Sequence, residues 1–422
     1  MTRVNAAQDK SLDLLVRSYR ANAHGVGGGW YNRLDEGTPG PTATAVALTM
    51  FEMAGRRPKQ YEDAVKFLTS RQVSASEQVI DGGWATNTSV GHTVTDATAW
   101  ILRFLGTSGS FWDPGLPNVE RAYRWIIKNA NKDGGWGAAQ GCPSRIWLTC
   151  LCLRAVAKLN HHEPAVDSAV DWLLSQHDSK MGGWGEAAKA PMSLVHSAAA
   201  LTAIRDCRPD CHDRAVELGY QYLEEALNSQ LTTDRYVESY EVSVTIGSRR
   251  STWQNGMLHY VAPVAACALI RHPEKANLDL LGKLYESILD KQLEAGHWPS
   301  IHGGPNISIW SVWPFYESLC DLRRIPLQRY DDSLTLLPGT VIIRDSLRKK
   351  TSIRKIWRQD RVHRGRQIAL RYGATALLGA SLIIGLATFF LHWIGLNELL
   401  IGLGFPVLLF ILQEISARRR KS

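Results

Sequence analysis

One short run of the sequence combines residue types that bind metal ions: Cys207, Cys211 and His212. Thiolates and imidazoles are common ligands of zinc, and a structural zinc site normally takes four ligands. No fourth ligand follows at a suitable spacing, and the run Asp-Cys-Arg-Pro-Asp-Cys-His has the composition of a loop. We therefore interpret the run as a loop, and we expect neither a metal ion nor another cofactor.

Asp96 is the acidic residue with the most informative neighbours. The stretch Thr93-Val94-Thr95-Asp96 fits the pattern Ser/Thr-x-x-Asp, which is typical of the start of a helix. A carboxylate in the first turn also interacts favourably with the helix dipole. A structural role at a helix start is therefore one interpretation of Asp96.

The elements that must position such residues form an internal repeat. Gly-Gly-Trp occurs four times, and a degenerate copy, Gly-His-Trp, follows later; the tryptophans are Trp30, Trp84, Trp136, Trp184 and Trp298. They are 54, 52, 48 and 114 residues apart, so the last interval spans two periods. One repeat, near residues 213 to 272, has therefore lost its signature, and six repeats are predicted.

Each repeat has the pattern of two helices on either side of a glycine turn. The first helix is amphipathic, as in Tyr61 to Arg71, and the second is apolar on nearly every face, as in Ser193 to Ile204. A helix that is apolar all round must be buried. We therefore predict an all-α fold, an (α/α)6 toroid of helical hairpins over residues 1–325. Its second helices would form an inner ring around a cavity, while the repeated Trp and Gln residues lock successive hairpins together.

Trp and Gln repeats joined to paired helices resemble the QW repeats of squalene-hopene cyclases, oxidosqualene cyclases and protein prenyltransferase beta subunits. The resemblance covers about residues 8 to 325. It implies a toroid that acts on an isoprenoid or another apolar lipid. Because one fold hosts several chemistries, the resemblance indicates the fold more strongly than the function.

The resemblance also implies a catalytic role for Asp96. Class II terpene cyclases carry the motif Asp-x-Asp-Asp-Thr-Ala, whose central Asp protonates an alkene or an epoxide. The matching stretch here is Val94-Thr95-Asp96-Ala97-Thr98-Ala99, which places Asp96 on the central acid and replaces its two partner acids by Val94 and Ala97. Such a donor must remain un-ionised in an apolar site until the substrate arrives.

A cyclase cavity also needs aromatic faces, because the negative face of a π system stabilises a carbocation. Seven ring-bearing side chains on the expected inner helices are candidates for binding a substrate: Trp100, Trp147, His196, Tyr260, Trp310, Trp313 and Tyr316. Inner helices are apolar in any case, so packing explains most of these residues. We expect two or three of them to line the cavity.

The zinc-dependent prenyltransferase branch fits less well, since Leu148 stands where a similar stretch of that branch places a His ligand.

Two hypotheses about the function remain. The first is a membrane-anchored enzyme of the terpene cyclase or prenyltransferase type that acts on an isoprenoid or another apolar lipid. The second is a non-catalytic toroid that binds a lipid or a protein, with its membrane segment as an anchor or a membrane-perturbing effector.

The C-terminal part of the chain predicts membrane attachment. Ala374 to Trp393 contains no Asp, Glu, Lys or Arg, and at about 1.5 Å per residue it is long enough to span a bilayer. Leu399 to Leu412 is a second, shorter apolar run. We predict a basic juxtamembrane linker at 326–371, a transmembrane hairpin at 372–415 and a basic cytoplasmic tail at 416–422.

The net charge of +8 is concentrated around these apolar runs. Residues 344–371 contain eleven Lys or Arg and two Asp, and residues 418–421 add four more basic residues. The remainder of the chain is therefore acidic, which argues against a nucleic-acid partner. Basic flanks favour the cytoplasmic side and an anionic lipid surface. We expect a multi-pass protein of the cell (inner) membrane, with its toroid in the cytoplasm and membrane lipids among its partners.

Overall fold

The computed structural model describes residues 3–322, apart from short gaps at 23–24, 75–80, 87–91, 109–116, 160–163, 230–234, 247–248, 273–276 and 301–306. The described residues belong to one compact unit, Met1–Lys349, and a second unit comprises Lys350–Ser422. The predicted transmembrane hairpin, together with nearly all of the linker and the tail, thus lies outside the described residues. Among the helices that are described, none has the length and apolar character needed to cross a membrane.

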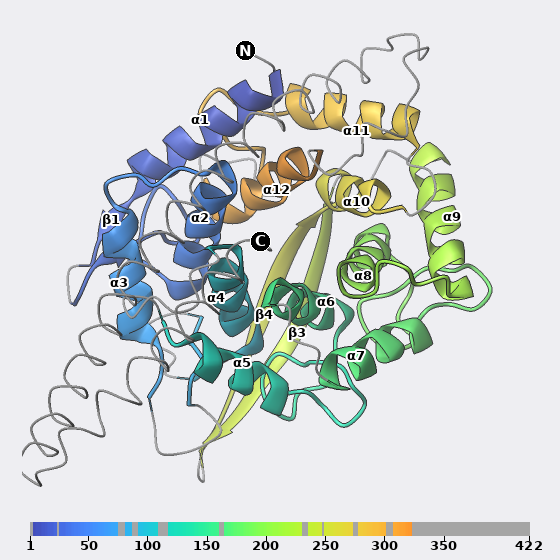
Figure 1. The fold of residues 1–422 in the computed structure, drawn as a ribbon, viewed down its shortest axis with the longest axis horizontal. Helices are drawn as coiled ribbons and strands as arrows, with labels where there is room; N and C mark the ends of the chain where they lie inside the picture. The colour runs from blue at the N-terminus through green and yellow to red at the C-terminus, as the bar shows by residue number, and fades with distance from the viewer. Residues whose placement is uncertain are drawn as a thin grey trace, which may run out of the picture. The chain divides into compact units, whose positions relative to one another are not determined.

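Twelve α-helices in the described part of the chain alternate between two concentric layers (Figure 1). The outer helices are α1 (Arg3–Ser18), α3 (Tyr61–Arg71), α5 (Val119–Lys128), α7 (Pro164–Ser175), α9 (Arg214–Ser229) and α11 (Leu278–Asp290). The inner helices are α2 (Pro41–Ala54), α4 (Thr95–Ser108), α6 (Ile146–Val156), α8 (Leu194–Cys207), α10 (Val261–Ile270) and α12 (Trp313–Asp321). Each inner helix packs against the next, and α12 packs against α2. The predicted ring of helical pairs is therefore confirmed.

The two layers differ in burial as their sequences predict. In α8 every residue from Val195 to Arg205 is buried, whereas α5 buries only Ala122, Tyr123, Trp125 and Ile126. The apolar inner helices are enclosed on all sides, and each outer helix covers them with one face. Short elements complete the fold: a two-residue pair of strands, β1 (Arg20–Ala21) with β2 (Gly28–Gly29), and 3₁₀ turns at Ala157–Leu159 and Ile309–Ser311.

The repeated tryptophans join the two helices of a pair. The indole N–H of Trp84 donates a hydrogen bond of 3.0 Å to the carbonyl of Leu68 in α3, and its backbone N–H donates one of 3.1 Å to the hydroxyl of Thr98 in α4. The same indole bond to the preceding outer helix recurs at Trp30, Trp136, Trp184 and Trp298. All five side chains are fully buried. Their role is structural, as the repeat pattern predicts, but they join the two helices of one pair and not, as expected, successive hairpins.

The first glycine of the turn joins neighbouring pairs and closes the ring. Gly82 has a φ of 95°, and a Cβ at this position would lie 2.5 Å from the carbonyl oxygen of Arg121 in α5. Gly296 has a φ of 99°, and a Cβ there would lie 2.3 Å from the carbonyl oxygen of Lys10 in α1. Gln292 also donates a hydrogen bond of 2.9 Å to the carbonyl of Ala7. The last turn therefore packs on the first helix.

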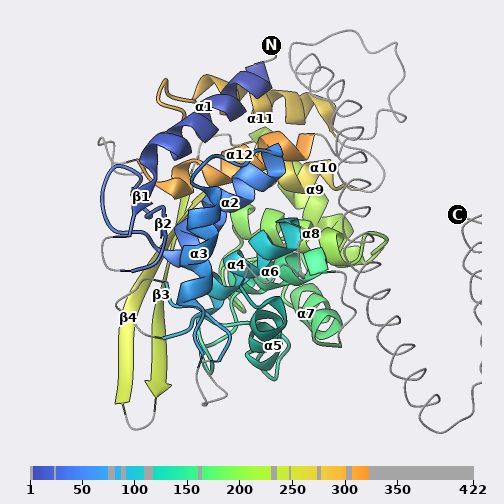
Figure 2. The ribbon, with the colours of Figure 1, turned by 60° about the vertical axis from the view of Figure 1, so that its left-hand side comes forward.

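The fifth pair departs from the all-α prediction. Between α9 and α10 the chain forms an antiparallel hairpin of β3 (Arg235–Ile246) and β4 (Arg249–Tyr260). It replaces the missing Gly-Gly-Trp turn and lies across one end of the ring (Figures 1 and 2). In β3, Glu238, Tyr240 and Val242 are buried and the residues between them are exposed. This alternation is the signature of a strand, and a search for helical repeats overlooks it.

The hairpin is held against the turn that precedes α6. Tyr240 and Val242 pack with Ala138, Ala139 and Leu148 in one small apolar cluster. Because the Gly-Gly-Trp turns precede the inner helices, the hairpin covers the end of the ring at which those helices begin.

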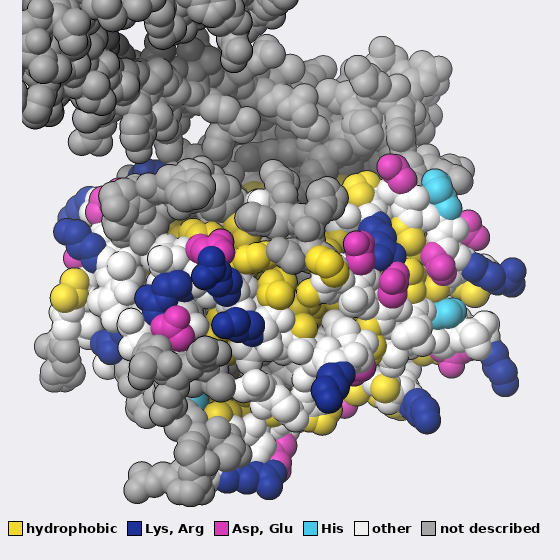
Figure 3. Space-filling model, turned by 60° about the horizontal axis from the view of Figure 1, so that its bottom comes forward, with side chains coloured by type: hydrophobic (Ala, Val, Ile, Leu, Met, Phe, Trp, Pro, Cys, Tyr) yellow, Lys and Arg dark blue, Asp and Glu magenta, His cyan; other side chains and the backbone are white. Residues whose placement is uncertain are grey.

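Charged side chains of both signs are mixed on the face of the molecule drawn in Figure 3. Figure 3 shows Lys and Arg side chains close to Asp and Glu side chains on the drawn face. Arg208, for example, pairs with Asp167 at 3.0 Å and with Asp171 at 2.6 Å. The excess of basic residues in the sequence lies instead in 344–371 and 418–421, outside the described residues.

Candidate active site

A cavity of about 340 Å³ lies inside the ring. All six inner helices contribute to its walls, as do strand β4 and the turn at Tyr31 and Asn32. Its volume falls at the lower end of the range of ligand pockets, roughly 300–1,000 Å³. The cavity can therefore enclose a small apolar molecule.

Helical spacing arranges the cavity wall in layers. Asp96, Trp100 and Arg103 lie at positions i, i+4 and i+7 of α4, and all three line the cavity. In α6, Trp147 and Arg154 line it with the same spacing of seven residues. Residues so spaced share one face of a helix. The acid and one tryptophan therefore lie near the end covered by the hairpin, and the arginines lie about 10 Å further along the helices.

Asp96 is in the first turn of α4 and is half-buried, with its remaining surface on the cavity. Burial away from water raises the pKa of its carboxyl to about 6, and hydrogen bonds from the backbone N–H groups of Asp96 and Ala97 oppose that rise. The carboxyl thus lies in the first turn of a helix that begins at Thr95, while the hydroxyl of Thr93, the expected cap, accepts a hydrogen bond of 3.1 Å from the indole of Trp125. The carboxyl of Asp96 is also an acid that remains partly protonated near neutral pH.

The hairpin supplies polar neighbours on the same side of the cavity. The hydroxyl of Tyr240 accepts a hydrogen bond of 3.0 Å from Asn255, and the guanidinium of Arg145 lies 4.7 Å from the centre of the Tyr240 ring. Burial, together with the negative charges of Asp96 and Glu238, holds the pKa of Tyr240 well above its usual range. Tyr240 therefore remains a neutral phenol near Asp96.

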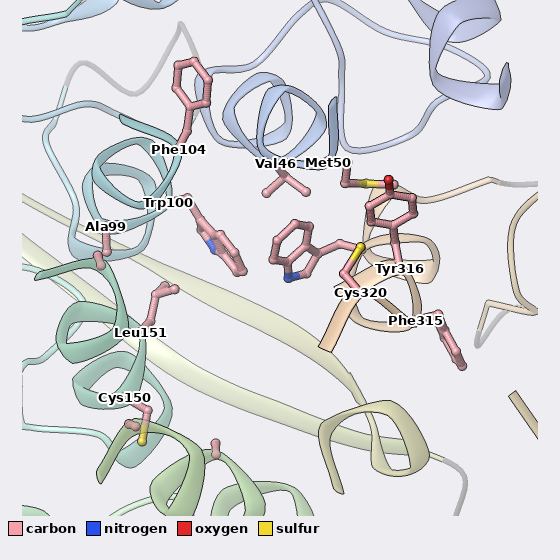
Figure 4. Close-up of a cluster of buried hydrophobic side chains, with 14 of the residues drawn as sticks. Val46, Met50, Ala99, Trp100, Phe104, Cys150, Leu151, Phe315, Tyr316 and Cys320 are labelled. Carbon is pink, nitrogen blue, oxygen red and sulfur yellow. The ribbon is translucent and has the colours of Figure 1, made fainter. Parts of the chain in front are cut away.

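Five of the seven expected ring-bearing residues line the cavity: Trp100, Trp147, Tyr260, Trp310 and Trp313. Trp100 packs edge-on against Trp313, with 5.3 Å between ring centroids. In Figure 4, Trp100 and Leu151 point into the space between the inner helices, whereas Phe104 points away from it. The aromatic lining is thus more extensive than the two or three residues expected from the sequence.

The other two expected residues, His196 and Tyr316, are not among the cavity-lining residues of the described chain. Tyr316 is 1% exposed and lies beside Met50 in Figure 4, on a different face of α12 from Glu317, which lines the cavity. His196 is fully buried in α8 and faces the hairpin instead.

His196 belongs to a buried cluster that the sequence analysis missed. One carboxylate oxygen of Glu238, Oε2, lies 3.1 Å from Nε2 of His196 and 3.1 Å from Nε2 of His259, and Oε1 accepts a hydrogen bond of 2.7 Å from Arg145. Burial acts to raise the pKa of Glu238, but the two histidines outweigh it and hold that pKa well below its usual range. Burial lowers the pKa of His259. The alternating pattern of residues 236–244 was the available signal for this cluster.

The far end of the cavity carries a buried network of ion pairs. Glu317 pairs with Arg103 and, at 2.7 Å, with Arg154, which in turn donates to Asp206 at 3.1 Å. Arg271 extends the network by linking Asp206 to Asp321. Acids and arginines are equal in number, so the network adds no net charge to the cavity.

Comparisons with known proteins agree with this architecture. The family model of the squalene-hopene cyclase C-terminal domain matches residues 86–204, a segment that includes Asp96. A drimenyl diphosphate synthase from Streptantibioticus cattleyicolor is 29% identical over 121 residues, covering 28% of this chain and 22% of that protein. A probable squalene–hopene cyclase from Sinorhizobium fredii is 26% identical over 233 residues, covering 47% of this chain and 35% of that protein. The chain thus spans about a third or less of the length of these relatives.

Solved structures show a similar helical fold. A family 76 glycoside hydrolase from a bovine Bacteroides thetaiotaomicron strain superposes with a TM-score of 0.51 at 10% identity, covering 77% of this chain and 78% of that chain. The type II terpene cyclase MstE from Scytonema has a TM-score of 0.49 at 12% identity, covering 75% of this chain and 97% of that chain. Likeness at this level of identity concerns the fold alone. The sequence matches confirm the resemblance to squalene-hopene cyclases.

Proposed function

We propose that the ring is a terpene cyclase-like enzyme that binds an isoprenoid or a similarly apolar lipid in its cavity and protonates an alkene through Asp96. The observation that carries the proposal is a carboxyl group whose pKa is raised to about 6 in the wall of a cavity lined by aromatic rings. Further support comes from the curated relatives, one named a drimenyl diphosphate synthase and the other a probable squalene–hopene cyclase.

The chemical step follows from the arrangement of the wall. The alkene's π electrons take the proton of Asp96, so a C–H bond forms, the acid becomes a carboxylate and a carbocation remains on the substrate. At pH 7 a carboxyl of pKa about 6 is protonated in roughly a tenth of the molecules. The aromatic rings of the wall would then stabilise the cation. At Trp100 and Trp313 the guanidinium of Arg103 already lies over the ring, at 5.2 and 5.0 Å from the centroids. Transfer of a proton from the cyclised cation to water gives a neutral product, and Asp96 takes up a proton from solvent before the next turnover.

The replacement of Asp96 by Asn tests the proposal. Asp96→Asn keeps the size of the side chain and removes the acidic proton, so product formation from a panel of prenyl diphosphates and squalene should fall by about 10²–10⁴-fold. Glu120→Gln is the matched control, because Glu120 is also in the first turn of a helix and its side chain is 56% exposed. Gas chromatography with mass spectrometry measures the products. An Asn variant with unaltered product formation would remove Asp96 as the acid.

The replacement of two motif acids by Val94 and Ala97 favours a second candidate, a non-catalytic toroid that binds a lipid or a protein partner. Mass spectrometry of lipids that copurify with the chain separates the two candidates. A bound isoprenoid that is never converted would support the binding protein. A purified chain that is empty and inactive toward every substrate offered would indicate a protein partner.

We also propose that residues 372–415 anchor the ring to the cell (inner) membrane as a transmembrane hairpin, with the ring in the cytoplasm. Support comes from the apolar runs and their basic flanks. An anchor would hold the cavity close to the bilayer in which an apolar substrate dissolves.

A further inference from the structure

Three buried side chains from separate elements bring ligand atoms to one point. They are His196 in α8, Glu238 in β3 and His259 in β4, with exposed fractions of 0%, 0% and 3%. Their atoms Nε2, Oε2 and Nε2 all lie within 4.8 Å of one another. Each Nε2 is 3.1 Å from Oε2 of Glu238.

Modest side-chain shifts would fit these atoms around a metal ion. Two ligand atoms bound tetrahedrally to zinc at about 2.1 Å lie about 3.4 Å apart. Each Nε2–Oε2 separation would therefore lengthen by about 0.3 Å, and the two Nε2 atoms, which are up to 4.8 Å apart, would approach one another by as much as about 1.4 Å. Two imidazoles and one carboxylate are also a donor set that zinc accepts in catalytic sites, where a fourth position stays open. We propose that His196, Glu238 and His259 bind a divalent transition-metal ion, with zinc as the best match.

Neighbouring side chains orient two of the three ligands, His196 and Glu238. Nδ1 of His196 lies 3.1 Å from the hydroxyl of Ser193, and Oε1 of Glu238 accepts a hydrogen bond of 2.7 Å from Arg145. Metal-binding histidines and carboxylates commonly have such partners on their other atoms. These contacts leave Nε2 and Oε2 directed at the proposed ion.

The buried carboxylate of the cluster has one charged partner outside it. Glu238 pairs with Arg145 at 2.7 Å, and Arg145 also lies 3.5 Å from Glu186, whose side chain is 31% exposed. The alternative to a metal ion is a network in which both imidazoles hydrogen-bond to Oε2 of Glu238.

The proposed ion lies in the cavity wall. His259 lines the cavity, and its ring centre is 4.0 Å from that of Trp147. A water molecule or an oxygen atom of the cavity's occupant could take the fourth position. The sequence analysis expected no metal because its only candidate was the run from Cys207 to His212. In the structure Cys207 donates instead to the carbonyl of Leu153, at 3.6 Å.

Metal titration of the untagged full-length chain tests the proposal. After treatment with a chelator, the wild-type protein should bind one equivalent of Zn²⁺ in competition with a chromogenic chelator. Co²⁺ should give the visible absorption of a four- or five-coordinate site. Glu238→Gln should weaken Zn²⁺ binding at least 100-fold, whereas Glu225→Gln and His177→Gln, at a carboxylate and a histidine outside the cluster, should leave it unchanged.

Circular dichroism in the presence of chelator shows whether each variant folds, and the Co²⁺ spectrum of the wild-type protein requires no variant at all. Wild-type protein without Co²⁺ absorption, or with Zn²⁺ binding equal to that of a folded Glu238→Gln variant, would overturn the proposal and leave the hydrogen-bonded network. Because the readout is metal binding, it is independent of the outcome for Asp96 and product formation.

Discussion

At the scale of single residues, two opposing effects act on the ionisation of Asp96. Its position in the first turn of α4 stabilises a carboxylate, through the backbone N–H groups of Asp96 and Ala97. Burial in the cavity wall destabilises the same carboxylate, and burial prevails, because the pKa rises from its ordinary value of 3.8 to about 6. A residue that served only as a cap would be better placed in water.

The raised pKa of Asp96 predicts that the stability of the folded protein depends on pH. Between about pH 4 and pH 6 the folded protein binds more protons at Asp96 than the unfolded chain does, so stability falls as pH rises through this window and the loss then persists at neutral pH. Asp96→Asn should therefore be more stable than wild type at pH 7, by up to about 3 kcal/mol, and the difference should vanish near pH 4. Denaturant unfolding at several pH values measures this.

The control for this experiment is Glu120→Gln, which should show no such pH-dependent gain. If Asp96 only caps the helix, Asp96→Asn would be nearly neutral at every pH and Asp96→Ala would cost about 0.5–2 kcal/mol. That pattern would contradict the buried-acid interpretation.

At the scale of elements, the Gly-Gly-Trp turn does two separate tasks. Its tryptophan ties an outer helix to the inner helix of the same pair, and its first glycine packs on the next outer helix, as Gly82 does on Arg121. In the fifth pair, which lacks this turn, the hairpin of β3 and β4 takes its place. The face of the hairpin that points into the ring then carries residues of the site.

Because only one of two glycines with positive φ packs on a neighbouring helix, we expect their replacement by alanine to destabilise the fold to different extents. Gly82 and Gly141 have positive φ values of 95° and 80°, but a Cβ on Gly82 would meet the carbonyl of Arg121 at 2.5 Å, whereas one on Gly141 would meet nothing within 4 Å. Gly82→Ala should destabilise the fold by roughly 1–3 kcal/mol more than Gly141→Ala, since both share the backbone strain and only Gly82 has the clash. Thermal unfolding compares them, and equal losses would show that packing between neighbouring pairs contributes little.

At the scale of the whole molecule, the described ring has mixed surface charge, and the basic residues are concentrated in the C-terminal segment of the sequence. The ring and the basic C-terminal segment thus favour different kinds of partner. The ring offers a cavity with an aromatic wall and a network of ion pairs at one end, and the basic segment suits an anionic lipid surface.

The proposed membrane topology can be tested by labelling. Single cysteines introduced at Asn397 and at Ser422 should react differently with a membrane-impermeant thiol reagent. The reagent is added to cells whose outer membrane has been made permeable and whose inner membrane is intact. The position at Asn397 should be labelled, because it lies at the tip of the proposed hairpin, and the one at Ser422 only after the cells are opened. Labelling at Ser422 alone in intact cells would reverse the orientation.

The sequence by itself determined the ring. Helix periodicity, glycine turns and buried tryptophans are local properties that recur in each pair, so one pattern read along the chain predicts their arrangement. It also indicated Asp96 and most of the aromatic wall, because residues at i, i+4 and i+7 of a buried helix share a face.

Only the tertiary structure decided which residues of distant segments meet in the site. His196, Glu238 and His259 belong to a helix and two strands, and they meet because the hairpin folds back over the ring. The pairing of Arg103 and Arg154 with Glu317 likewise joins three inner helices that only ring closure brings together. Whether Tyr316 or Trp313 faces the cavity depends on the rotation of α12 about its axis. Such contacts depend on the packing of distant segments, and no local pattern encodes that packing.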